Sequence, residues 1–246
     1  MISASETVNQ IVMNHLSAAE VFDHVGIAYC CEGWKTLERA CSEIGVSVED
    51  VIRALDRPAP RDKKSESPAS TQTLEFLILR VLQAQHEELR RALPPLETLA
   101  ATAIERNRAK HPELVLIEEL LRSLSSDLTA HLAEEERNLF PALLQLELAY
   151  LGENPAPGYP MQVRDIVGSM SQQHDISGGT LRRITAASNG FCAPERTDDS
   201  FHAFYDGLQK FFSDLHHDFY VENNILFPQA AQMEAAIFRG SRLGKC

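Results

Sequence analysis

Two copies of one short pattern in the second half of the chain constrain the fold most. Residues 135–141 read EERNLFP and residues 222–228 read ENNILFP, so both follow Glu-x-x-x-Leu-Phe-Pro. Each copy lies in a long segment whose apolar residues recur at helical spacing. Two helices that contain the same pattern imply a helical bundle with approximate two-fold symmetry, which suits a site built between facing helices.

Four long segments with helical spacing would form this bundle, and almost no segment alternates as a strand does. Pro94 and Pro95 should end or kink the first segment, and Pro141 should disturb the second. The predicted fold class is therefore all-α, with a small helical N-terminal domain followed by an up-down four-helix bundle. The segments span roughly 73–93, 113–150, 163–188 and 200–234.

A change in composition divides the chain into two domains. Residues 56–70 read DRPAPRDKKSESPAS, without a large apolar side chain, so we expect a solvated linker over residues 57–72. It separates a compact helical domain at residues 1–56 from the bundle at residues 73–246. A domain as small as the first is marginal alone, so docking onto the bundle or formation of a homodimer should support it.

The composition excludes several classes of function. A net charge of −12 argues against nucleic acid or an anionic membrane as a partner. No apolar run approaches the roughly 20 residues that span a bilayer, and no secretory signal is visible. Five cysteines form no even disulfide framework, which favours the reducing cytoplasm.

Histidines and carboxylates at helical spacing predict a metal centre. His131 lies four residues before Glu135, and at the matching Glu222 the same offset holds Asp218, with His217 five residues before. Imidazoles and carboxylates without thiolates suit a non-haem di-iron or di-manganese centre. Glu135 and Glu222 would bridge the metals. The imidazole candidates are His86, His111, His131 and His174.

An ordinary structural role competes with this interpretation. A single histidine on an apolar helix face is more often a core residue, and a His-x-x-x-Glu pair is frequently a surface pair. Metal binding is favoured because each of the four segments supplies at least one ligand type and two of them supply aligned glutamates.

Cys30 and Cys31 are adjacent in a stretch with Gly26 and Gly33, so we expect them in a turn. Adjacent cysteines are poorly placed for an unstrained mutual disulfide, which favours paired thiols. They could undergo transient redox chemistry, bind iron or nitrosyl species, or deliver metal to a recipient. The alternative is that two small residues pack a tight turn.

These motifs resemble those of the RIC (repair of iron centres) family of di-iron proteins, whose members include YtfE, ScdA, NorA and DnrN. GIAYCCEGWKTLERACSEIGV, with its cysteine pair, resembles the ScdA-type N-terminal domain. His86, His111, HLAEE (131–135), QHD (173–175) and VENNILFP (221–228) resemble the ligand motifs of a hemerythrin-like domain.

One position departs from the family pattern, which has a histidine four residues before the last bridging glutamate. Here that residue is Asp218. Either Asp218 is the ligand, which keeps the helical register, or His217 reaches the metal through local unwinding or a π-bulge. The register favours Asp218 slightly.

The resemblance implies two non-haem iron ions with oxo and carboxylate bridges and a role in nitrosative or oxidative stress. The protein would repair iron–sulfur clusters, with Cys30 and Cys31 in a functional role, or bind or reduce nitric oxide with electrons from a partner. Its partners would be NO or O₂ and proteins with damaged clusters. One alternative is a hemerythrin-like O₂ or NO carrier or sensor without turnover, and another is a helical bundle without metal.

Overall fold

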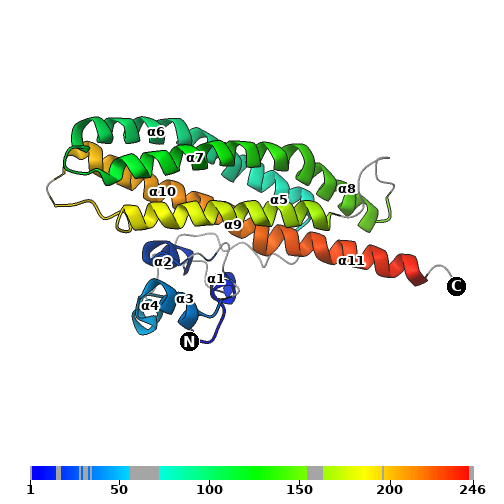
Figure 1. The fold of residues 1–246 in the computed structure, drawn as a ribbon. Coiled ribbons are helices and arrows are strands. Elements are labelled where there is room, and N and C mark those ends of the chain that lie inside the picture. The colour runs from blue at the N-terminus through cyan, green and yellow to red at the C-terminus, as the bar shows by residue number, and fades with distance from the viewer. Residues whose placement is uncertain are drawn as a thin grey trace.

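The computed structural model describes residues 2–14, 18–27, 29, 33, 35–55, 72–153, 163–195 and 197–243. Every regular element within these ranges is helical, which confirms the predicted all-α class. Four long rods run side by side, and a group of short N-terminal helices lies against them (Figure 1). No helix in the described part of the chain is both long and apolar enough to cross a membrane.

The rods correspond to the four predicted segments. The first contains α5 (Leu74–Arg80), η2 (Val81–His86) and α6 (Glu87–Asn107), and the second contains α7 (Glu113–Glu134), η3 (Glu135–Leu139) and α8 (Phe140–Tyr150). The third is α9 (Arg164–Ala187). The fourth contains α10 (Asp199–Val221), η4 (Glu222–Leu226) and α11 (Phe227–Leu243). Helix α6 packs on α7 and α10, α7 packs on α9, and α8 packs on α11.

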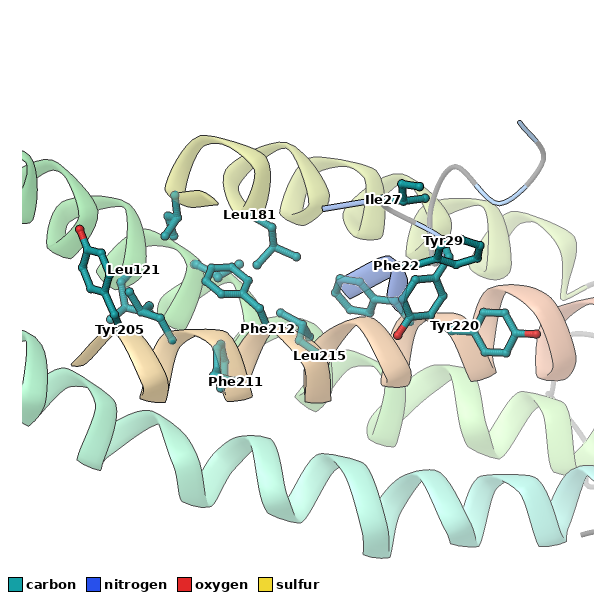
Figure 2. Close-up of a cluster of buried hydrophobic side chains, with 14 of the residues drawn as sticks. Phe22, Ile27, Tyr29, Leu121, Leu181, Tyr205, Phe211, Phe212, Leu215 and Tyr220 are labelled. Atoms are coloured by element: carbon teal, nitrogen blue, oxygen red, sulfur yellow. The ribbon is translucent and has the colours of Figure 1, made fainter. Parts of the chain in front are cut away.

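The N-terminal part consists of α1 (Val8–Asn14), α2 (Ala18–Val25), α3 (Leu37–Ile44) and α4 (Val48–Leu55). Its apolar side chains belong to the same hydrophobic cluster as those of the bundle. Phe22 and Tyr29 lie beside Leu215 and Tyr220 of α10 (Figure 2). This docking buries the apolar face that so small a unit cannot bury alone. Residues 56–71, which include most of the predicted linker, lie outside the described residues.

The sequence predicts that Pro94 and Pro95 end or kink the first segment. Helix α6 does not end there, because it continues to Asn107. Both prolines face solvent, so water can reach the carbonyl groups that lose their helical partners. On the opposite face, Leu93, Leu96 and Ala100 are buried in the bundle core. Packing of this face holds the helix together in spite of its prolines.

Each of the three elements η2, η3 and η4 is a single wide π-helical turn. In two of them the repeated motif explains the turn: the N–H of Phe140 donates to the carbonyl of Glu135, and that of Phe227 to the carbonyl of Glu222, five residues back. A proline follows in each motif, and its ring would clash with the carbonyl four residues before it in a regular α-helix. The wide turn accommodates that ring, so the disturbance expected at Pro141 is a π turn rather than a break.

The two-fold repeat extends to a pair of buried carboxylates. Glu147 and Glu234 each lie twelve residues after the first glutamate of their motif. Glu147 accepts hydrogen bonds from the N–H groups of Leu74 (2.8 Å) and Glu75 (3.0 Å) at the start of α5. Glu234 accepts one from the N–H of Val163 (2.8 Å), just before α9. Each motif-bearing rod therefore caps the first helix of another rod.

Candidate metal centre

Six polar side chains converge inside the bundle at the level of the π turns. None of them is more than 4% exposed, although all six are ionisable. They come from all four rods and form two groups, in each of which the potential ligand atoms lie within 4.8 Å of one another. The first group contains His131, Glu135, His174 and Glu222, and the second contains His86, Asp218 and Glu222.

The first group, here called the His131–His174 half, has two imidazoles aimed at one point. The Nε2 atoms of His131 and His174 are 2.9 Å apart. The Nε2 of His131 is 3.3 Å from Oε1 of Glu135, and that of His174 is 3.3 Å from Oε2 of Glu222. Ligand atoms at right angles around one ion, each at about 2.1 Å, lie about 3 Å apart. The spacing therefore suits a single shared ion.

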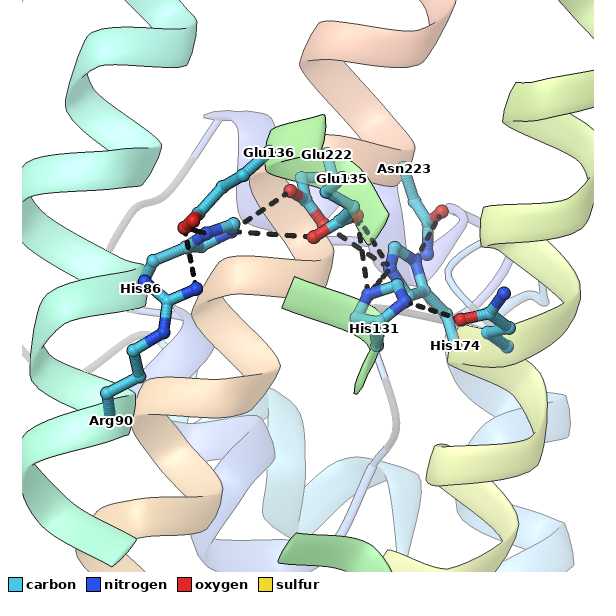
Figure 3. Close-up of polar contacts among 9 residues, drawn as sticks. His86, Arg90, His131, Glu135, Glu136, His174, Glu222 and Asn223 are labelled. Carbon is cyan, nitrogen blue, oxygen red and sulfur yellow. Dashed lines mark hydrogen bonds and ion pairs between the residues drawn. The ribbon is translucent and has the colours of Figure 1, made fainter. Parts of the chain in front are cut away.

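Glu135 and Glu222 each present one oxygen to each half of the centre. Oε2 of Glu135 lies 3.4 Å from Nε2 of His86, whereas its Oε1 faces His131. Oε1 of Glu222 lies 3.8 Å from Nε2 of His86, whereas its Oε2 faces His174 (Figure 3). This is the arrangement that a carboxylate needs in order to bridge two metal ions.

The second group, here called the His86–Asp218 half, contains one imidazole and one carboxylate besides the shared glutamates. Asp218 is fully buried, and neither of its oxygens has a hydrogen-bond partner among the described residues. The N–H of Glu222 donates to the carbonyl of Asp218, so the α-helical register continues between them and places both side chains on one face. The π turn begins only at Glu222.

Each histidine of the centre is held from behind by its Nδ1–H. His86 donates to Oε1 of Glu136 (2.9 Å), His131 to Oε1 of Gln173 (2.9 Å) and His174 to Oδ1 of Asn223 (3.0 Å). These bonds fix the ring orientation and direct each Nε2 at the carboxylates (Figure 3).

Without metal, bound protons balance the buried charges of the centre. Burial alone would lower the pKa of His86 and His174, but the carboxylates of Glu135 and Glu222 outweigh it and raise the pKa values to about 11 and about 10. Burial, and then the charge of Glu222, raise the pKa of Asp218 well above its ordinary value. Metal ions would take the place of these protons, so binding should release protons.

The donor set fits iron. The atoms that face the interior of the centre without a hydrogen-bond partner in the described chain include Nε2 of His86 and both oxygens of Asp218, Glu135 and Glu222. Buried charges of this kind are normally paired or coordinate a metal. Imidazole and carboxylate donors suit a non-haem iron or manganese pair in a helical bundle. Neither group of described residues includes a cysteine, so the set does not resemble a structural zinc site.

Two predicted metal ligands lie outside this centre. His111 precedes α7, and the helix from Glu113 to His131 alone rises by about 27 Å. Its Nδ1 donates to Glu113 at 2.9 Å, and its ring contacts Phe201. The structure therefore does not support the interpretation of His111 as a ligand. His217 is exposed, because the α-helical register turns it away from the face that carries Glu222. Cys30 and Cys31 lie outside the described residues.

Motif spacing did not identify the side chains that accept hydrogen bonds from the histidines. Gln173, Glu136 and Asn223 each adjoin a ligand candidate in the sequence, and this is the only signal that could have identified them. Helical spacing predicts that Glu136 turns away from the site. The structure instead places its carboxylate on His86 and on Arg90, whose Nη2 is 2.7 Å away.

Two family models match separate parts of the chain. Residues 77–230 match the model of the hemerythrin HHE cation binding domain. Residues 4–59 match the model ScdA_N, described as a domain of unknown function.

Curated relatives match both parts together. The chain is 28% identical over 233 residues to the iron-sulfur cluster repair protein YtfE of Escherichia coli O8, covering 94% of this chain and 98% of that protein. It is 29% identical over 222 residues to the protein of the same name from Pectobacterium atrosepticum, covering 88% and 92%.

Proposed function

Because the chain belongs to the hemerythrin HHE cation-binding family, we propose that it holds two iron ions and repairs damaged iron–sulfur clusters. The relatives that match nearly its whole length are named iron–sulfur cluster repair proteins, in agreement with the resemblance to the RIC family. The observation that carries the proposal is the pair of buried ligand groups that share Glu222.

In this proposal His131 and His174 hold one ion and His86 and Asp218 hold the other, with Glu135 and Glu222 as bridges. The ions would supply redox-active binding of a small ligand, for which nitric oxide or O₂ is proposed. Glu136, Gln173 and Asn223 keep the imidazoles in place during metal exchange. Reduction of nitric oxide would take electrons from a separate donor, since the sequence shows no flavin or dinucleotide motif.

Cys30 and Cys31 are proposed to transfer iron between this centre and proteins with damaged clusters in the cytoplasm. Tyr29, the residue before this pair, supports the assignment. It is 1% exposed, and its ring lies 5.6 Å from that of Tyr220 and 5.9 Å from that of His216 on α10. The same helix carries Asp218, so the residue that precedes the cysteine pair packs against a rod that contributes to the centre.

A carrier or sensor of O₂ or NO without turnover is not favoured. The relatives that cover both the N-terminal part and the bundle are named for cluster repair. A carrier also has no use for the cysteine pair of the N-terminal part.

The test measures iron per chain and cluster repair together. Protein from iron-replete cells, purified without oxygen, should contain about two irons per chain and restore a dehydratase whose [4Fe–4S] cluster has been damaged by NO. Glu222→Ala should lose most of the iron and of the repair, because it removes a ligand shared by both groups.

The matched control is His111→Ala, which removes a histidine of the same domain that lies far from the centre. It should leave both iron and repair unchanged. Protein without iron, even after reconstitution, would refute the di-iron assignment. Iron-loaded protein that restores no cluster would refute the repair function.

A further inference from the structure

The two-fold symmetry of the centre relates pairs of residues whose chemistry can be compared. When Glu135 is aligned with Glu222, His131 corresponds to Asp218 and Glu136 corresponds to Asn223. The geometry follows the same relation, because Glu136 accepts from His86 as Asn223 accepts from His174. The two halves therefore share one frame and differ at two pairs of residues.

Both differences place negative charge in the same half. Asp218 belongs to the group of His86, where the other half has the neutral imidazole of His131. His86 is hydrogen-bonded to the carboxylate of Glu136, where His174 has the neutral amide of Asn223. The His86–Asp218 half thus has one imidazole and two carboxylates of its own, whereas the His131–His174 half has two imidazoles and neutral amides.

Gln85 supports the same asymmetry. Gln173, the residue before His174, accepts a hydrogen bond from His131. Gln85 is the residue before His86 and lies on η2, which packs against α10. Its buried Oε1 has no hydrogen-bond partner in the described part of the chain. The residue that corresponds to His131 in this half is Asp218, which has no N–H to donate.

We propose that the two halves differ in metal selectivity, so that the His86–Asp218 half prefers Fe²⁺ over Mn²⁺ less strongly than the His131–His174 half does. The inference rests on the proposed function only in that the six residues hold two metal ions. Carboxylates favour Mn²⁺, whereas imidazoles favour Fe²⁺. Relative to Fe²⁺, Mn²⁺ binds least well where nitrogen donors dominate. A carboxylate at Asp218 in place of an imidazole therefore reduces the difference in affinity between Fe²⁺ and Mn²⁺ in that half.

The experiment loads the full-length, metal-free chain without oxygen with equal concentrations of Fe²⁺ and Mn²⁺, and then removes free metal. Elemental analysis gives the total metal per chain. Anomalous diffraction from crystals, collected at the iron and manganese absorption edges, gives the Mn:Fe ratio at each position. The ratio should be several-fold higher in the His86–Asp218 half than in the His131–His174 half.

Two variants test the cause. Asp218→His makes the halves alike in imidazole content and should bring the two Mn:Fe ratios close together. His217→Ala changes the exposed neighbour of Asp218 and should keep the wild-type distribution. If Asp218→His does not fold, the ratios in the wild-type chain still decide the proposal.

The outcomes separate this inference from the proposed function. Two metals per chain with equal Mn:Fe ratios at both positions would overturn the inference and leave the binuclear centre intact. Absence of bound metal would overturn the binuclear centre itself. An unequal ratio that persists in Asp218→His would also overturn the inference, because Asp218 would not be its cause.

Discussion

Glu147→Ala should destabilise the bundle without touching the candidate metal centre. The side chain is 7% exposed and accepts hydrogen bonds from the N–H groups of Leu74 at 2.8 Å and Glu75 at 3.0 Å. Thr73 caps the next N–H, that of Phe76. The first turn of α5 therefore depends on Glu147 for two of its three capped groups.

The magnitude follows from which N–H groups water can reach. A hydrogen bond to a charged group contributes about 1.5–3 kcal/mol. Leu74 is fully buried, so its N–H would stay without a partner, whereas the exposed Glu75 can bind water instead. We expect a loss of about 3 kcal/mol in the free energy of unfolding. At 2–4 °C per kcal/mol for a chain of this size, Tm should fall by about 6–12 °C.

Thermal and urea unfolding of the chelator-treated protein, followed by far-UV circular dichroism, measures this loss without a contribution from bound metal. Glu234→Ala should cost less, because Glu234 accepts a single hydrogen bond, from the N–H of Val163. The exposed Glu119 on α7 supplies the control, Glu119→Ala. If Glu147→Ala unfolds within about 1 kcal/mol of that control, the capping argument is wrong.

Two further predictions concern the centre and the cysteine pair. Despite burial, carboxylates hold the pKa of His86 at about 11 and that of His174 at about 10, so their contribution to stability is complete below the ordinary value of 6.5. That contribution is lost as pH rises toward 10–11, so the Tm of metal-free protein should fall between pH 7 and 10; a rising Tm would contradict the assignment. Replacing Cys30 and Cys31 by Ser should leave the bundle iron intact and impair cluster repair, whereas a parallel loss of iron would mean that the two parts share one site.

The sequence predicted the four rods closely because apolar spacing is a local property. The second rod begins at Glu113 directly after His111-Pro112, as expected, and the third occupies residues 164–187. The sequence did not show that the first helix continues past Pro94 and Pro95, because burial of the opposite face, which holds α6 together, depends on rods that are distant in sequence.

For the candidate site, helical register predicted which residues of one helix face the centre, but not which side chains reach it from a neighbouring rod. It favoured Asp218 over His217, and the structure places Asp218 in the centre because the backbone between Asp218 and Glu222 is α-helical. The same rule failed for Glu136, because a side chain that turns away from the centre of its own rod can still reach a histidine on the neighbouring rod, as Glu136 does with His86. Spacing alone could not exclude His111. It shows on which face of a helix a residue lies, but not at which level along the helix axis the site is.

Because of the π turns, the number of residues in each motif sets the orientation of all residues that follow it in the same rod. Each wide turn amounts to one residue inserted into an α-helix. Deleting Arg137 or Asn224 would restore regular winding and rotate everything beyond it by about 100°. Glu147 or Glu234 would then swing away from the N–H groups that it caps, while the glutamate before the deletion kept its place. Single-residue deletions in these motifs should therefore be far less tolerated than substitutions at the same positions.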